Sequence, residues 1–372
     1  MTWSPQQDQA IKAVRTWLAD KRGPQVFRLF GYAGSGKTTL ARHLAEDVDG
    51  DVLYGAFTGK ASLVLRKKGC VGASTIHSMI YKPVEDPVSG ITEFVLNHDS
   101  GVASAPLVII DEVSMVGEDL ARDLLSFGTK VLVLGDPAQL PPVKGEGYFI
   151  NAKPDIMLTE VHRQAIESPI IRMSMDVREG RGLVPGSYGD SLVIKRSLMD
   201  KDSLGAMVLD ADQVLCGLNL TRQNFNRRIR QLHGIAGEIE AWHPVAGDRL
   251  VCLKNDKTQG LLNGGLWTVG EVEIKKSHFH MTVASLDEPQ AAHVKAKVAH
   301  QFFLGTERDM DWRERKKSDE FCYGYALTVH KSQGSQWDNV MVFDESSVFR
   351  EDEAKHLYTA ITRAAQKVTV VV

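Results

Sequence analysis

The sequence contains few cysteines and no apolar run long enough to cross a membrane. Its four cysteines lie far apart, with no C-x-x-C pair and no Cys/His spacing suited to zinc. This pattern favours buried thiols in a reducing compartment over disulfides or a metal centre. The longest apolar runs, such as Leu107 to Ile110, are far shorter than the roughly 18 residues of a membrane-spanning helix. The N-terminal segment carries charges where a secretion signal would be apolar. We therefore expect a soluble, cytoplasmic protein with no membrane partner.

An excess of positive charge is also absent. The chain has 44 Lys and Arg residues against 47 Asp and Glu residues, which gives a net charge of −3. Any surface that binds nucleic acid must therefore be local. With 372 residues, of which 43% are hydrophobic, the chain is long enough for two or three globular domains at about 150 residues each. This composition excludes a largely disordered chain.

The first half of the sequence has the pattern of an α/β fold. Ser4-Pro5-Gln6-Gln7 forms a capping box, which predicts a helix at the start of the chain. Val26 to Phe30 predicts a strand that runs into a glycine-rich loop, and apolar residues at helical spacing follow. Two continuous apolar runs, Leu107 to Ile110 and Val131 to Leu134, predict parallel strands that are buried on both faces.

The second half begins to alternate between apolar and polar residues. From about 241 to 305 this alternation, interrupted by glycines, predicts a small antiparallel β module. The mixed-charge segment from Asp309 to Glu320 follows, and its basic residues predict a solvated helix. The α/β pattern then returns, with a strand expected at Val340 to Phe343 and a helix at Ala354 to Ala365.

A phosphate-binding loop is the clearest motif in the chain. Gly31 to Thr38 matches G-x-x-x-x-G-K-[ST] in full and lies between a predicted strand and a predicted helix. Backbone N–H groups of such a loop surround phosphates, the lysine neutralises β and γ oxygens, and the Thr38 hydroxyl can reach Mg²⁺. A chance glycine turn is the alternative. The motif predicts ATP and Mg²⁺ as cofactors, with these nucleotide contacts: Gly34, Ser35, Gly36, Lys37, Thr38 and Thr39.

Two acidic residues end the predicted strand that begins at Leu107. Such a loop needs a carboxylate to hold magnesium and a base to position water. We assign Asp111 to magnesium, together with Thr38, and Glu112 to the general base. The alternative is that this pair caps a helix.

Further motifs occur in an order that resembles superfamily 1B helicases of the RecD-like and phage Dda-like kinds. Gly135 to Val143 is similar to motif III of these enzymes over nine residues. The other similar segments are Gln7 (Q motif), Gly31 to Thr38 (motif I), Thr58 to Ala61 (Ia), Ser74 to Ser78 (Ib), Asp111 to Ser114 (II), Leu158 to Arg163 (IV), Thr328 to Gly334 (V) and Leu357 to Arg363 (VI). The resemblance covers nearly the whole chain.

The resemblance implies an α/β fold of two RecA-like P-loop domains, each with an insertion. The first domain, which binds ATP, would comprise residues 1–80 and 106–155, with a β-hairpin pin at 81–105. The second would comprise residues 156–240 and 320–372, with an SH3-like β-barrel at 241–319.

The resemblance also implies roles around ATP. Gln139 matches the γ-phosphate sensor, and Arg163 and Arg363 match two arginines that reach the γ-phosphate from the second domain. Lys37 and Glu112 complete the expected catalytic set. Gln7 matches an adenine contact, although the same side chain could close the capping box at the start of the chain instead.

A DNA track is implied by motifs Ia, Ib and V. Hydroxyl, imidazole and amine groups suit phosphate oxygens, so recognition would not depend on base sequence. Phe57 stands where the family commonly has proline, which puts the local backbone of motif Ia in question. In the pin, Phe94 is the candidate wedge, and the alternative is that Phe94 packs the hairpin onto its domain. The track residues are Thr58, Lys60, Thr75, His77, Thr328, His330 and Lys331.

Two further groups of residues have two interpretations each. The first resembles a DNA-contacting stretch of the second domain but equally fits a solvated helix face. It consists of Asn219, Arg222, Asn226, Arg227, Arg228 and Arg230. The second, four tryptophans, could stack on bases, but large aromatic residues more often lie in the core. These are Trp242, Trp267, Trp312 and Trp337.

The implied function is that of a monomeric, ATP- and Mg²⁺-dependent DNA helicase. It would move 5′ to 3′ on single-stranded DNA and open duplexes at single-strand/double-strand junctions. Its setting would be the cytoplasm of a bacterial or phage-infected cell, alongside a single-strand-binding protein or other replication and recombination proteins. The alternative is a DNA-stimulated ATPase that remodels protein–DNA complexes, or serves a larger recombination complex, without unwinding. An RNA substrate stays open, because such contacts do not read the 2′-OH.

Overall fold

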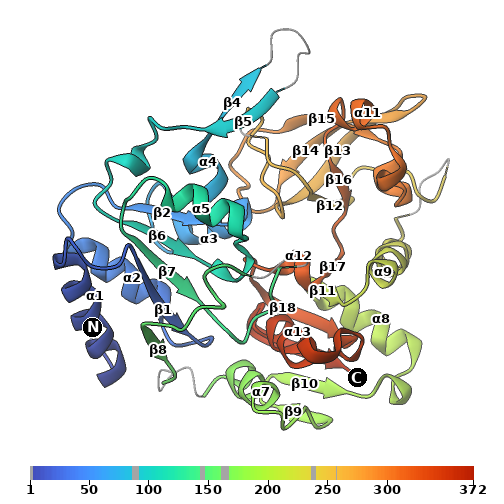
Figure 1. The fold of residues 1–372 in the computed structure, drawn as a ribbon. Coiled ribbons are helices and arrows are strands. Elements are labelled where there is room, and N and C mark those ends of the chain that lie inside the picture. Colours follow the sequence, from blue (N-terminus) through green and yellow to red (C-terminus); the bar gives the residue numbers. More distant parts are fainter. Residues whose placement is uncertain (1–2, 86–91, 143–146, 161–166, 236–239, 257) are drawn as a thin grey trace. The chain divides into compact units, whose positions relative to one another are not determined.

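The computed structural model spans residues 1–372 and describes all of them except 1–2, 86–91, 143–146, 161–166, 236–239 and 257. Contacts divide the chain into two compact units, Met1–Arg178 and Glu179–Val372. Each unit is built on a six-stranded, largely parallel sheet, and these sheets can be followed in Figure 1. The expected α/β class is confirmed.

The sheet of the first unit is parallel throughout, in the order β3-β2-β6-β7-β1-β8. Its strands are β1 (Val26–Gly31), β2 (Leu53–Ala56), β3 (Ser74–Thr75), β6 (Val108–Asp111), β7 (Val131–Gly135) and β8 (Ile156–Leu158). The helices of the unit are α1 (Pro5–Ala19), α2 (Lys37–Glu46), α3 (Gly59–Lys67), α4 (Ile76–Ile80), α5 (Glu118–Leu125) and α7 (Pro169–Arg178), with short 3₁₀ turns η1 (Gly101–Ala103) and η2 (Val113–Met115).

Alternate residues of these strands belong to two separate apolar clusters. Leu132 packs with residues of α1 and α2, whereas its neighbour Val133 packs with residues of α4 and α5. Successive side chains of a strand point to opposite faces, so both faces of the sheet are covered. The strands expected at Leu107 to Ile110 and Val131 to Leu134 are therefore confirmed as doubly buried parallel strands.

A two-stranded hairpin projects between α4 and η1. It pairs β4 (Tyr81–Glu85) with β5 (Thr92–Leu96) antiparallel, with Pro83 opposite Phe94. The hairpin lies within the segment expected to form a pin, and its tip, residues 86–91, lies outside the described residues.

The second unit contains two sheets. The larger has the order β17-β11-β18-β19-β10-β9 and is parallel except for the β9–β10 pair. Its strands are β9 (Gly186–Tyr188), β10 (Ser191–Ile194), β11 (Gln213–Cys216), β17 (Ala326–Thr328), β18 (Trp337–Phe343) and β19 (Ala364–Val371). Its helical segments are η3 (Arg196–Leu198), α8 (Lys201–Asp210), α9 (Asn219–Leu232), α12 (Val329–Ser332), η5 (Ser346–Asp352) and α13 (Glu353–Ile361).

The smaller sheet is the expected antiparallel β module, with the order β15-β14-β13-β12-β16. Its strands are β12 (Arg249–Cys252), β13 (Leu266–Ile274), β14 (His278–Ser285), β15 (Val294–Ala299) and β16 (Phe321–Tyr323). Between β15 and β16 lie α10 (Gln301–Leu304), η4 (Glu307–Asp309) and α11 (Trp312–Lys316). The predicted alternation is confirmed, because Phe279, Met281 and Val283 are all buried on one face of β14.

Three boundaries differ from those expected. β8 pairs with β1, so the first sheet continues past residue 155. β16 pairs with β12, so the β module takes a strand beyond residue 319. The helix expected to reach Ala365 ends at Ile361, because the chain turns through Thr362 and Arg363 and enters β19 at Ala364.

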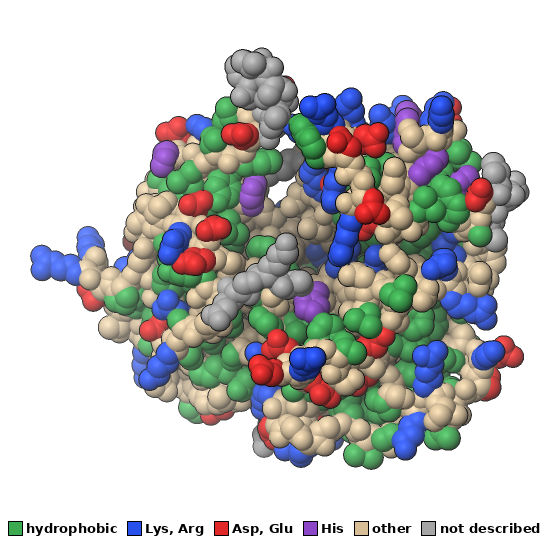
Figure 2. All heavy atoms as spheres, turned by 45° about the vertical axis from the view of Figure 1, so that its right-hand side comes forward, with side chains coloured by type: hydrophobic (Ala, Val, Ile, Leu, Met, Phe, Trp, Pro, Cys, Tyr) green, Lys and Arg blue, Asp and Glu red, His purple; other side chains and the backbone are tan. Residues whose placement is uncertain are grey.

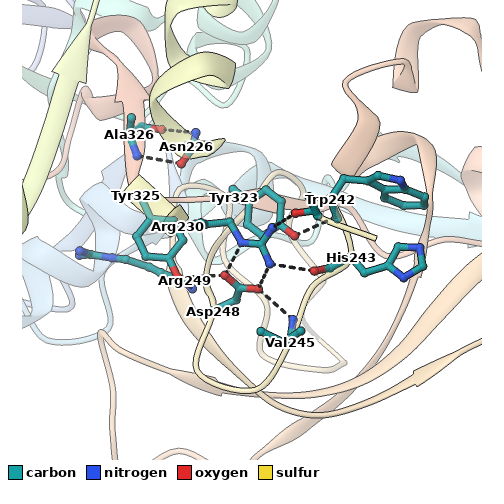
Figure 3. A network of polar contacts seen from close by, with 11 residues as sticks. Asn226, Arg230, Trp242, His243, Val245, Asp248, Arg249, Tyr323, Tyr325 and Ala326 are labelled. Carbon is teal, nitrogen blue, oxygen red and sulfur yellow. Dashed lines mark hydrogen bonds and ion pairs between the residues drawn. The ribbon is translucent and has the colours of Figure 1, made fainter. Parts of the chain in front are cut away.

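A buried polar network fastens the β module to α9 (Figure 3). Nε and Nη2 of Arg230 each donate to a carboxylate oxygen of Asp248 at 2.8 Å, and both side chains are almost fully buried. Arg230 also donates to the carbonyl oxygens of Ala241 (2.6 Å) and His243 (2.8 Å). Asp248 accepts a further hydrogen bond from the hydroxyl of Tyr325 at 2.9 Å. Every hydrogen-bonding group of this buried pair thus has partners from α9, the β module and the chain next to β17.

Candidate nucleotide and nucleic-acid sites

The phosphate-binding loop connects β1 to α2, as the sequence predicted. Gly34 and Gly36 have φ values of 78° and 79°, a region that favours glycine. Gly31 has no room for a side chain, because an added Cβ would lie 2.6 Å from Oγ of Ser35. The glycines are therefore required by the turn itself.

The functional groups of the loop make hydrogen bonds within the first unit. Nζ of Lys37 donates to the carbonyl oxygens of Gly31 (2.6 Å) and Tyr32 (3.1 Å). The Thr38 hydroxyl donates to Oδ2 of Asp111 at 2.7 Å, which joins the start of α2 to the end of β6. Hydroxyl and carboxylate oxygens are the donors that Mg²⁺ prefers, so this pair fits the assigned metal role.

Gln7 makes both local and long-range contacts. Its Oε1 accepts from the backbone N–H of Ser4 (3.1 Å), and its own backbone N–H donates to Oγ of Ser4 (3.4 Å), which completes the capping box. Its side-chain amide donates to the carbonyl oxygen of Ser35 at 3.0 Å. The capping role is confirmed, and the amide also contacts the phosphate loop. The adenine contact stays a prediction.

Glu112 has an unusual backbone for a residue other than glycine. Its φ and ψ are 54° and 47°, in the left-handed region. Its backbone N–H donates to Oδ1 of Asp111 at 2.8 Å, and its side chain makes no cap hydrogen bond to η2. The capping alternative therefore does not account for Glu112. Strained residues of this kind concentrate at functional sites, which is consistent with the assigned base.

Motif III follows β7 and contains a buried amide. Oδ1 of Asp136 accepts from the backbone N–H of Ala138 at 3.0 Å, which forms the turn. Gln139 is 8% exposed, and among the described residues its Oε1 has no hydrogen-bond partner. A buried polar atom without a partner is costly, so a ligand or water would be favoured there.

The three threonines expected to contact DNA share a structural role that the sequence analysis missed. Oγ1 of Thr58 accepts from the N–H of Ala61 (3.1 Å) and so caps α3. Thr75 caps α4 and Thr328 caps α12 in the same way. The available signal was a threonine at the junction between a strand and a helix. Phe57, which precedes the first of these caps, is 37% exposed.

Lys60 and His77 lie near these caps but differ in exposure. Lys60 is only 6% exposed, whereas His77 lies at the surface. The His77 ring centre is 4.6 Å from that of Tyr81 and 4.8 Å from that of Phe94. Phe94 nevertheless stays 58% exposed. It thus contacts its own domain, as the alternative proposed, and still presents much of its ring to solvent.

Tyr81 fixes the base of the hairpin. Its hydroxyl donates a short hydrogen bond to Oδ2 of Asp123 on α5. Burial, together with the hydrogen bond to Asp123, raises the pKa of Tyr81 to about 12. Tyr81 therefore keeps its proton, and the hairpin remains tied to the helix that follows motif II.

Arg363 is buried within the second unit. It is 5% exposed, and its guanidinium donates to the carbonyl oxygens of Thr359 (3.1 Å) and Ser335 (3.2 Å). These bonds tie motif VI to the segment after motif V. Arg163, the other expected arginine, lies outside the described residues.

The motif V side chains His330 and Lys331 differ in their surroundings. Lys331 is exposed, whereas His330 is half-buried with its ring 5.5 Å from that of Phe349. Burial lowers the pKa of His330, and Asp352 opposes this effect. A neutral imidazole at neutral pH would bind a phosphate through a hydrogen bond rather than an ion pair.

Neither sequence interpretation of the basic stretch on α9 holds for its main members. Arg222, Asn226 and Arg230 are all buried, so they form neither a solvated face nor a DNA surface. The amide of Asn226 donates to the Ala326 carbonyl oxygen at 3.0 Å, and its Oδ1 accepts from the N–H of the same residue at 2.9 Å. Arg227 and Arg228 are exposed.

The four tryptophans also divide into two groups. Trp267 and Trp337 are buried, and Trp242 packs its ring against His243 and Phe279. Trp312 differs, because 55% of it is exposed on α11. The core expectation is wrong for this tryptophan. All four cysteines are buried, as expected, and none of the described helices is long and apolar enough to span a membrane.

Two segments of the chain match models of known protein families. Residues 2–191 match a model described as an AAA domain, and residues 323–371 match a UvrD-like helicase C-terminal domain. The first segment contains the phosphate loop, Asp111 and Gln139. The second contains motifs V and VI.

Several curated proteins are similar in sequence. The ATP-dependent RecD2 DNA helicase of Deinococcus radiodurans is 29% identical over 93% of this chain and 46% of its own length. The conjugal transfer protein TraA of Rhizobium radiobacter is 27% identical over 92% of this chain and 30% of its own length. The ATP-dependent DNA helicase Pif1 of Bdellovibrio bacteriovorus is 24% identical over 97% of this chain and 85% of its own length. The chain thus spans less than half the length of RecD2 and TraA.

Solved structures of Pif1 helicases share the fold. A Pif1 chain from a study of DNA unwinding at forked duplexes has a TM-score of 0.59 at 19% identity, over 99% of this chain and 92% of its own. Bacteroides Pif1 bound to single-stranded DNA has a TM-score of 0.56 at 17% identity, with the same coverage. These likenesses extend over both units.

Proposed function

The chain belongs to the AAA domain family and is related to superfamily 1B helicases, and on that premise we propose that it is an ATP-dependent DNA helicase. The main observation behind this proposal is that motif I, after β1, and motif II, at the end of β6, are in direct contact. There the phosphate loop and the acidic residues of motif II meet through the bond between Thr38 and Asp111. P-loop enzymes use this combination of loop, hydroxyl and carboxylate to hold a nucleotide and its metal.

Each residue of this site has a proposed role. Lys37 would exchange its two carbonyl partners for phosphate oxygens, and backbone N–H groups of residues 34–39 would surround the phosphates. Thr38 and Asp111 would hold Mg²⁺, which when bound neutralises charge on the phosphates. Glu112 would take the proton of the attacking water, and Gln139 would donate from its side-chain NH₂ group to the γ-phosphate, while its unpartnered Oε1 would accept a hydrogen bond from that water. Gln7 would contact adenine.

Arg163 and Arg363 would stabilise charge on the transferred γ-phosphate. An arginine in this role contributes about 10³- to 10⁵-fold to turnover. Within the described part of the chain, Arg363 donates to two carbonyl oxygens and to a threonine hydroxyl, which are neutral groups. Its positive charge would therefore favour an anion beside it.

The DNA strand would be held through its phosphates. The proposed contacts are the caps Thr58, Thr75 and Thr328, with Lys60, His77, His330 and Lys331 beside them. The exposed ring of Phe94 would stack on the last base pair at a junction and act as the wedge. The antiparallel β module would form an SH3-like domain that supports the strand, and the active form would be a monomer that moves 5′ to 3′.

Strand separation of two forked duplexes tests this proposal. One duplex carries only a 5′ single-stranded tail and the other only a 3′ tail, and both are incubated with ATP and Mg²⁺. We expect the 5′-tailed duplex to open, the 3′-tailed duplex to stay closed, and Lys37→Ala to open neither. DNA-stimulated ATP turnover without opening of either duplex would refute the helicase and favour a translocating ATPase that remodels protein–DNA complexes.

The wedge has a separate test. Phe94→Ala should reduce duplex opening while ATP turnover on single strands persists, because the ring acts only at the junction. Phe94→Tyr keeps an aromatic face and serves as the matched control. Equal opening by Phe94→Ala and the unchanged protein would show that Phe94 only packs the hairpin against His77.

A further inference from the structure

A polar pocket in the β module is assigned no role by the proposed function. Its volume is about 280 Å³, and it lies between the chain after β12 and the chain that joins α11 to β16. Its ionisable lining residues are Lys254, Asp256, Lys316, Lys317, Asp319 and Glu320.

The acidic residues of the pocket are already occupied by neighbouring donors. Oδ1 of Asp256 accepts from the backbone N–H (2.8 Å) and hydroxyl (2.6 Å) of Thr258. The amide of Gln259 donates at 3.1 Å to both Asp256 and Asp319. Both carboxylate oxygens of Glu320 accept from Arg315, at 2.7 and 3.1 Å. Neighbouring donors thus hold these carboxylates in place within the module.

The three lysines have the opposite character. Lys254, Lys316 and Lys317 are all exposed, and none of the ion pairs found among the described residues includes them. Because Glu320 is paired with Arg315, the lining leaves three ammonium groups and only two carboxylates, those of Asp256 and Asp319. Among the residues that line the pocket the surplus is therefore positive, which favours an anionic partner.

An exposed aromatic ring lies beside these charges. Trp312 precedes Lys316 by four residues on α11, so the two side chains share one face of the helix. The indole is 55% exposed, and the guanidinium of Arg313 lies 5.4 Å from its ring centre. Leaving a large aromatic ring in water has a cost, which a stacking partner would remove.

We propose that Lys254, Trp312, Lys316 and Lys317, here called the α11 surface, bind single-stranded DNA. The lysines would contact consecutive phosphates and the indole would stack on one base, the combination that sequence-independent strand binding uses. The proposal rests on the proposed function, in which the chain handles such a strand. An acidic protein segment would pair with the lysines, but its carboxylates would offer no flat ring to stack on the indole of Trp312. On the face shown in Figure 2, blue and red side chains are interspersed.

Binding of fluorescent oligothymidylate to the full chain without nucleotide tests the α11 surface. The triple variant Lys254→Gln, Lys316→Gln, Lys317→Gln should reduce the slope of log K against log salt by about 2, at about 0.7 per phosphate contact on a single strand. Trp312→Ala should weaken binding about fivefold or more, and Trp312→Phe should restore most of the affinity. All four positions are exposed, so folding should be unaffected.

Lys201, Lys276 and Lys295 supply the matched control. They are exposed lysines of the same unit that do not line the pocket, so changing all three to Gln alters the net charge equally. An unchanged salt slope in the pocket variant, or an equal drop in the control, would overturn the proposal. So would equally strong competition by polyglutamate of the same charge, which would assign the surface to an acidic protein.

The outcome is independent of unwinding. If neither forked duplex opens but Trp312→Ala still weakens strand binding, the helicase proposal fails and the α11 surface stands. If the 5′-tailed duplex opens but both variants bind oligothymidylate like the unchanged protein, the α11 surface fails and the helicase proposal stands.

Discussion

Removing the buried carboxylate of Asp248 should destabilise the second unit strongly. The side chain is fully buried and accepts hydrogen bonds from Nε and Nη2 of Arg230, the N–H of Val245 and the hydroxyl of Tyr325. Asp248→Asn keeps the shape but removes the charge, which leaves a buried guanidinium with only carbonyl partners. Breaking a buried ion pair from one side costs about 3–5 kcal/mol, and we expect a loss of unfolding free energy in that range.

A double-mutant cycle measures the interaction free energy between Arg230 and Asp248 separately from the contacts that each makes with other residues. Arg230→Met should cost a similar amount, since it leaves Asp248 charged and buried. The double variant Arg230→Met with Asp248→Leu removes both charges, so it should cost less than the sum of the single variants Arg230→Met and Asp248→Leu by about 2 kcal/mol. Arg228→Met, on the exposed side of the same helix, is the control and should change stability by less than about 0.5 kcal/mol.

Urea unfolding followed by tryptophan fluorescence measures these differences, because four of the six tryptophans lie in the second unit. Hydrogen exchange read by mass spectrometry then locates the change, which should centre on residues 241–252 and 321–328. A cost below about 1 kcal/mol for Asp248→Asn, or strict additivity in the cycle, would refute the view that this ion pair fastens the module to α9.

Three further outcomes follow from individual side chains. Burial, together with nearby His330, lowers the pKa of His356 to about 4. The unfolded chain therefore binds an extra proton between about pH 6.5 and 4, so stability should fall by about 3 kcal/mol as the pH drops through that window. His356→Leu should flatten the curve of urea midpoint against pH, and an unchanged curve would argue against this group. Thr75→Ala should cost about 1 kcal/mol through the lost cap, and Thr75→Ser much less, as thermal unfolding would reveal. Glu112→Gln should lower steady-state ATP turnover at least about 10²-fold at unchanged stability, and full turnover would exclude Glu112 as the base.

Local patterns in the sequence predicted the nucleotide site well. The phosphate loop, the strand that ends at Asp111 and the capping box at Ser4 depend on neighbouring residues, and the structure has each where it was expected. Doubly buried strands were also recognisable, because a continuous apolar run of strand length is typical of a parallel strand that is covered on both faces. What the spacing could not reveal was that Gln7 contacts the loop at Ser35, 28 residues away.

Charge was a poorer guide than apolar pattern. Arg222, Asn226 and Arg230 are four residues apart, so they share one face of α9, and that face is buried. Their partners, Cys322, Ala326 and Asp248, are about 20 to 100 residues away in the sequence. Only tertiary contact distinguishes such an arginine from a solvated one. The four-residue spacing was the available signal, together with a lone Asp248 just before an apolar strand.

Only two residues, Gly324 and Tyr325, connect the two sheets of the second unit at this point. β16 of the β module ends at Tyr323 and β17 of the larger sheet begins at Ala326. Gly324 lies so close to the backbone of Leu250 that no side chain fits there, and the hydroxyl of Tyr325 donates a hydrogen bond to Asp248. Both residues of the linker are therefore held in place. β17 leads directly to Thr328 at the start of α12. A displacement of the β module would therefore be transmitted directly through β17 to motif V, because the two residues that join the sheets are held in place on the β module side.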